Sequence, residues 1–154
     1  MSAQDFKHLK EDLNWLDRGD WVAILPKDET FKSLPVAFQE SILNWSDKGY
    51  AILDGYFSPS QIDALNQSVD LLVKSSKADW RNGNKIMFAI HQSKTLFEIG
   101  SDSDLAAILA LLLGKPVDLF QSINFLTCSQ QRTHSNAVYM STFSKGNMIA
   151  CCIA

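Results

Sequence analysis

The residues best suited to carry chemistry in this sequence are His134 and Asn136, within the stretch from residue 130 to 140. If that stretch is extended, side chains two positions apart share a face, so the imidazole and the amide would point together. Two histidines and one carboxylate on one face of an octahedral iron form the site of non-haem Fe(II) oxygenases. The sequence therefore predicts half of such a metal site, with an amide in place of the carboxylate.

Two strand-like runs flank this stretch, at residues 119–126 and 148–154. Polar segments with serine and glycine separate the runs, as is typical of turns between strands. We therefore expect residues 117–154 to form a partial antiparallel sheet.

The helices that would pack on this sheet carry clear boundary signals. Ser58 can cap a helix, Pro59 suits its first position, and Gln61 completes a capping box, which predicts a helix over residues 59–74. A second helix, over residues 103–113, is apolar nearly all round, so we expect it to be buried. The remaining expectations are a helix from residue 35 to about 45, a strand at 50–53, a polar loop at 75–84, and a strand or short helix at 85–90.

Composition restricts the classes of function. With 154 residues, 46% hydrophobic and 20% charged, the chain has the size and character of one globular domain. A net charge of −3 without a basic stripe argues against nucleic acid and anionic membrane surfaces as partners. No apolar run is long enough to span a bilayer, and the N-terminus has no signal-peptide core. The three cysteines lie in no metal-binding pair, so we expect reduced thiols in a cytoplasmic protein.

Several motifs, in their order and spacing, resemble the phytanoyl-CoA dioxygenase family of Fe(II)/2-oxoglutarate enzymes. They are Gly49 to Ser58 with the helix that follows, Asn84 to Phe88, Leu109 to Val117, Phe120 to Phe125 and Gln130 to Asn136. The resemblance covers residues 41–154 and leaves residues 1–40 as an N-terminal helical extension. It implies an α+β fold in which N-terminal helices pack on an incomplete antiparallel double-stranded β-helix, or jelly roll.

The resemblance also implies a site. His134-Ser135-Asn136 occupies the place of the family's His-x-Asp, so His134 and Asn136 would be the metal ligands for Fe(II). Asn124 and Gln131 correspond to positions that help to bind the co-substrate 2-oxoglutarate, since an amide can donate to a carboxylate. Lys85 lies near a region that reaches 2-oxoglutarate in relatives, but a solvated or salt-bridged lysine is the simpler interpretation of its sequence position.

Three functional interpretations remain open. The first is a hydroxylase that acts on a small-molecule substrate and is catalytically impaired by the neutral amide of Asn136. The second is an inactive jelly-roll module that binds a small molecule or serves a structural role. The third is a non-functional gene fragment. Residues 148–154 favour truncation, because a bare apolar strand exposes an edge prone to pairing. The family's second histidine and its 2-oxoglutarate-binding arginine would then lie beyond Ala154.

Overall fold

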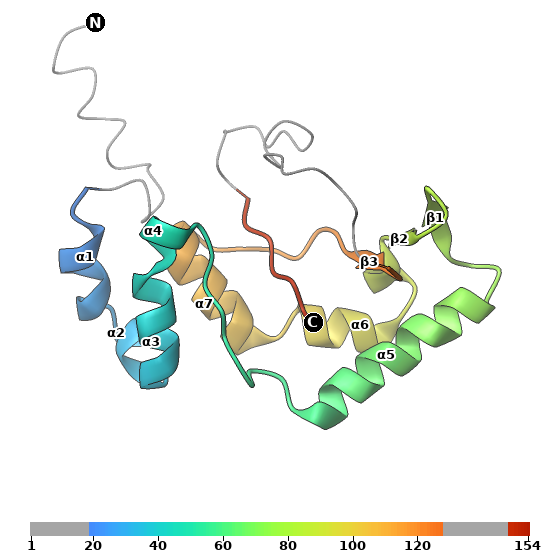
Figure 1. The fold of residues 1–154 in the computed structure, drawn as a ribbon, viewed down its shortest axis with the longest axis horizontal. Helices are drawn as coiled ribbons and strands as arrows, with labels where there is room; N and C mark the ends of the chain where they lie inside the picture. The colour runs from blue at the N-terminus through green and yellow to red at the C-terminus, as the bar shows by residue number, and fades with distance from the viewer. Residues whose placement is uncertain (1–18, 128–147) are drawn as a thin grey trace, which may run out of the picture. The chain divides into compact units, whose positions relative to one another are not determined.

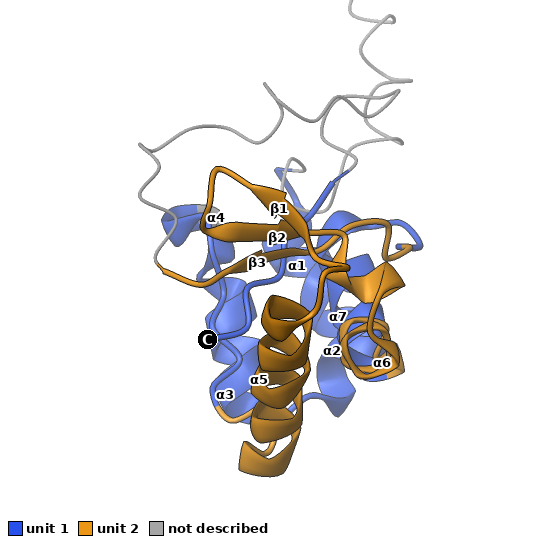
Figure 2. Cartoon of the chain, turned by 90° about the vertical axis from the view of Figure 1, so that its right-hand side faces the viewer, with its two compact units in different colours: residues 1–54, 104–117, 135–154 blue, residues 55–103, 118–134 orange. Residues whose placement is uncertain are grey.

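The computed structural model describes residues 19–127 and 148–154 of the chain. Its contacts divide the chain into two compact units (Figure 2). Unit 1 comprises residues 1–54, 104–117 and 135–154, and unit 2 comprises residues 55–103 and 118–134. The elements are helices and a three-stranded antiparallel sheet (Figure 1), so the predicted α+β class is confirmed, while the jelly-roll arrangement stays a prediction.

Unit 1 is helical over most of its described residues. Its elements are α1 (Trp21–Ile24), the 3-10 turn η2 (Leu25–Lys27), α2 (Glu29–Ser33), α3 (Val36–Leu43), α4 (Trp45–Lys48) and α7 (Ser103–Leu113), the last without its first residue. Asp28 caps α2 by accepting hydrogen bonds from the backbone N–H groups of Thr30 and Phe31. The predicted helices at 35–45 and 103–113 are both present, and α4 ends at Gly49 in the left-handed conformation that glycine tolerates best.

The strand predicted at residues 50–53 is wrong. These residues belong to no strand, and the Ile52 N–H donates to the side-chain oxygen of Ser41 at 2.7 Å. The run Tyr50 to Leu53 has the composition of a strand, but it lacks a partner strand to complete the backbone hydrogen bonds in the described structure.

Unit 2 begins with α5 (Pro59–Lys74), which forms as predicted. The Gln61 N–H donates to Ser58 Oγ at 3.3 Å, and the Ser58 N–H donates to Gln61 Oε1 at 2.9 Å, which completes the capping box. The buried side of this helix carries Leu72.

The sheet of unit 2 has the order β1 (Asp79–Arg81), β2 (Lys85–Met87), β3 (Ile123–Phe125), with both pairings antiparallel. Asn82 and Gly83 turn the chain between β1 and β2 with positive φ angles of 54° and 74°. Asparagine and glycine are the residues that adopt this conformation most readily.

Two expectations about this sheet are corrected. Residues 75–84, predicted as a polar loop, contain β1. Residues 117–154 were expected to build the sheet, but among residues 117–127 and 148–154 only Ile123–Phe125 forms a strand. Residues 128–147 lie outside the described structure, so for them the expectation stays a prediction. The physical reason is that β3 pairs with β2, which belongs to the β1–β2 hairpin, and the turn at Asn82 and Gly83 makes that hairpin possible.

Hydrogen bonds beyond the three paired residues fix β3 against β2. The Phe88 N–H donates to the Ser122 carbonyl at 2.9 Å, and the Leu126 N–H donates to the Asn84 carbonyl at 3.0 Å. The Ser122 hydroxyl also accepts from the Ile90 N–H at 3.1 Å. The register between the two strands is therefore held at both ends.

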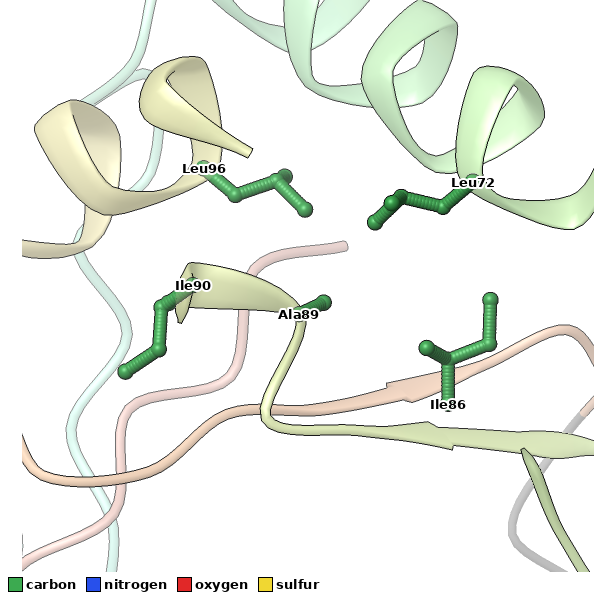
Figure 3. Packing of buried hydrophobic residues seen from close by; sticks show 5 residues of the cluster. All are labelled: Leu72, Ile86, Ala89, Ile90 and Leu96. Atoms are coloured by element: carbon green, nitrogen blue, oxygen red, sulfur yellow. The ribbon is translucent and has the colours of Figure 1, made fainter. Parts of the chain in front are cut away.

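One face of the sheet packs on helices. Ile86 is fully buried and points from β2 toward Leu72 of α5 (Figure 3). The same cluster includes Ala89 and Ile90 from η3 (Ala89–His91) and Leu96 from α6 (Lys94–Gly100). The helix α6 was not among the helices expected from the sequence. We call the sheet face that carries Ile86 the inner face and the opposite one the outer face.

Candidate functional site

Three of the four site residues predicted from the sequence, Gln131, His134 and Asn136, lie outside the described residues. The predicted metal pair and the common cavity with Asn124 therefore stay predictions. Asn124 is described, at the centre of β3.

Asn124 lies on the inner face. It is the direct partner of Ile86 across the β2–β3 pair, and directly opposite residues of antiparallel strands share a face. Its side-chain oxygen is buried, with no hydrogen-bond donor among the described residues. A buried acceptor without a donor costs about 1–3 kcal/mol, so this amide oxygen is a candidate contact for a bound molecule or an ordered water.

The outer face carries a different set of side chains. The strand register aligns them in two rows across the sheet, the first made of Arg81, Lys85 and Phe125, and the second of Asp79, Met87 and Ile123. Asn124 and Lys85 are thus on neighbouring strands but on opposite faces, so one small ligand lying on one face meets only one of them.

Lys85 is the buried charged residue of the described chain, with only 8% of its surface exposed. Its ammonium nitrogen lies 5.2 Å from the centre of the Phe125 ring, and no carboxylate of the described residues forms an ion pair with it. The interpretation of Lys85 as a solvated or salt-bridged lysine is therefore wrong for the described structure. A contact with an aromatic ring offsets only part of the cost of burying a charge.

Arg81 lies directly opposite Lys85, from the other strand of the hairpin. Its Nε is 3.6 Å from Asp79 Oδ1, but the two side chains are 66% and 42% exposed, and such surface ion pairs are weak. Like charges directly opposite each other in a sheet are destabilising. The outer face therefore has two cations side by side, without a strong counter-charge from the residues that the structure describes.

The chemistry of the donor set does not fit a resident catalytic iron. The residues that the sequence nominates, His134 and Asn136, offer one imidazole and one neutral amide, whereas non-haem Fe(II) sites use three protein ligands that include a carboxylate. Within residues 19–127 and 148–154, no group of three or more histidine, cysteine, aspartate or glutamate side chains is placed to hold a metal ion.

Sequence reasoning missed the pairing of Arg81 with Lys85, although a signal for it was present. The dipeptide Asn82-Gly83 is typical of a β-hairpin turn, and a three-residue loop over residues 82–84 places residues 81 and 85 opposite each other. The sequence around Lys85 does not indicate that its side chain is buried, because this burial depends on tertiary packing.

No family model, no curated protein and no solved structure matches the chain. Among the helices described here, none combines the length and apolar character needed to cross a membrane.

Proposed function

We propose that this chain is a jelly-roll relative of the Fe(II)/2-oxoglutarate-dependent dioxygenases that binds 2-oxoglutarate but is impaired in turning it over. The observation that carries the proposal is Lys85, whose buried ammonium has no carboxylate partner in the described structure. A ligand carboxylate would supply the missing counter-charge.

The magnitude of this interaction is sufficient to matter. Hydrogen bonds to charged groups contribute about 1.5–3 kcal/mol, which corresponds to roughly a 10- to 100-fold change in affinity. Because Lys85 is already buried beside Phe125, little side-chain freedom remains to be lost when a ligand binds. 2-Oxoglutarate carries a carboxylate at each end, and either one can pair with the ammonium.

The impairment follows from the neutral amide at Asn136. A carboxylate contributes a full negative charge to a divalent cation, and an amide oxygen does not. Binding of 2-oxoglutarate and its oxidation are therefore separable properties. We propose that this chain keeps the binding and is impaired in the oxidation.

The proposal can be tested by titrating 2-oxoglutarate into the purified 154-residue protein by calorimetry, with and without the change Lys85→Met. We expect Lys85→Met to weaken binding by at least about tenfold, since it removes the charge and keeps the apolar stem. The free energy of unfolding should not fall, because the change also removes a buried charge with which no described carboxylate pairs. Lys77→Met, at an exposed position before β1, is the matched control and should bind like the wild type.

Two results would overturn the proposal. One is an absence of binding at millimolar 2-oxoglutarate by the wild-type protein. The other is wild-type affinity in Lys85→Met together with lost affinity in Asn124→Leu, which would place the ligand on the inner face instead.

A further inference from the structure

We infer that Arg81 is a second cationic contact for the ligand at Lys85, and that the outer face of the sheet therefore selects dianions over monoanions. The inference rests on the proposed function for the ligand's position, and it adds a residue and a charge preference that the proposed function does not contain.

The geometry places both cations within reach of one small molecule. Arg81 and Lys85 are direct partners across the β1–β2 pair, and the Cβ atoms of such partners are about 4.5–5.5 Å apart. Phe125 continues the same row on β3, so the two cations and the ring form one row across the three strands on the outer face. The turn at Asn82 and Gly83 and the Leu126-to-Asn84 backbone hydrogen bond fix this register.

The burial of the two cations differs, and the difference suggests separate roles. Lys85 is almost fully buried, whereas the Arg81 side chain is 66% exposed and free to adjust its position. An arginine can form two parallel hydrogen bonds with one carboxylate, while a lysine acts as a point charge. We therefore place one carboxylate of the ligand at Lys85 and the other at the more exposed Arg81.

Asp79 modulates this arrangement. Its carboxylate lies 3.6 Å from Arg81 Nε and competes with a ligand for the guanidinium. The competition is weak, because both side chains are well exposed. Removing the charge of Asp79 should therefore strengthen ligand binding, while removing the charge of Arg81 should weaken it.

The experiment compares 2-oxoglutarate with 2-oxopentanoate, which has the same chain length and keto group but only one carboxylate. We expect the wild type to bind 2-oxoglutarate about tenfold more tightly. Arg81→Gln should lower the affinity for 2-oxoglutarate to nearly that for 2-oxopentanoate, and leave 2-oxopentanoate within about twofold of wild type. Asp79→Asn should increase the affinity for 2-oxoglutarate, and Arg81→Lys should keep part of it.

Because Arg81 is exposed and faces a like charge, Arg81→Gln should fold as well as the wild type, which circular dichroism and urea unfolding can verify. Equal affinities of the wild type for the two ligands would overturn the inference. The inference would also be overturned if Arg81→Gln kept the wild-type affinity for 2-oxoglutarate while Lys85→Met lost it. That result would leave the proposed function intact. If the wild type binds neither ligand, both the inference and the proposed function fail.

Discussion

At the scale of single residues, Lys85 and Asn124 pose opposite problems on the two faces of one sheet. Among residues 19–127 and 148–154, no carboxylate pairs with the buried charge of Lys85 and no donor reaches the buried amide oxygen of Asn124. Either group destabilises the empty protein unless something else satisfies it. If both the stability and the ligand affinity of a substituted protein are measured, a residue that contacts a ligand can be distinguished from one that only destabilises the fold.

The change Asn124→Leu should raise the free energy of unfolding by about 1 kcal/mol in the absence of ligand. Leucine is close in shape to asparagine, and it removes an acceptor, beside the apolar Ile86, that no donor of the described chain reaches. Urea unfolding of the two proteins provides the measurement. A loss of stability would show that the amide has a partner in solution, such as an ordered water molecule.

The thiol of Cys151 provides a pH-dependent prediction. Cys151 and Cys152 are both free. Local burial of the sulfur and, second, the charge of Cys152 raise the pKa of the Cys151 thiol above its ordinary value. The reactive thiolate is therefore less populated at a given pH, and its fraction rises only as the pH approaches the raised pKa.

Alkylation of Cys151 by iodoacetamide at pH 8 should accordingly be slower than that of a free cysteine amide. Cys152→Ser removes the second cause and should make Cys151 react faster, with the difference closing at high pH. Peptide mapping of the alkylated sites follows each thiol separately. An identical Cys151 rate in the two proteins would contradict the assigned effect of Cys152.

At the scale of elements, α5 depends on its capping box. Ser58→Ala should destabilise the protein by about 1 kcal/mol, because it leaves the Gln61 N–H without its side-chain acceptor. Gln67→Ala, at an exposed position within the same helix, is the control and should be neutral or slightly stabilising. Equal urea midpoints for the two variants would show that the cap contributes nothing measurable.

The elements that could be predicted from the sequence are those with local boundary signals. The serine cap and proline start of α5 and the glycine after α7 act through neighbouring residues, so the sequence alone reveals them. The strand β1 is short, polar and mostly exposed, and its partner is chosen by the turn that follows it. Its apolar alternation is therefore too weak to distinguish it from a loop.

The candidate site was predictable to a smaller extent. The sequence indicated Asn124, but its face depends on the pairing with Ile86, and a shift of one residue would have turned it outward. Lys85 is buried by contacts that are distant in sequence, so its position near a turn gave no sign of its environment.

At the scale of the whole molecule, the 154-residue chain should not convert 2-oxoglutarate to succinate. One imidazole and one amide are too few donors to retain Fe(II), and loss of a supporting partner alone typically costs about 10–100-fold in metal affinity or activity. The assay contains the purified protein, Fe(II), ascorbate and 2-oxoglutarate, with a protein-free control. Asn136→Asp should not restore activity, because it adds one charge but no further imidazole.

Succinate above the protein-free control would contradict this prediction. It would leave the binding proposal standing, because turnover requires the co-substrate to bind first.

The loop lengths within unit 2 predict an order in which the three strands of its sheet pair. The strands β1 and β2 meet through residues 82–84, whereas the contacts of β3 span 32 residues between Ile90 and Ser122 and 43 between Asn84 and Thr127. Closing a longer loop costs more chain entropy, so the hairpin should form first and β3 should dock late. Until β3 arrives, Lys85 lacks the Phe125 ring and its ammonium remains hydrated. The ammonium group therefore loses its bound water when β3 docks on β2. A neutral side chain at position 85 avoids this dehydration and should make the docking of β3 faster.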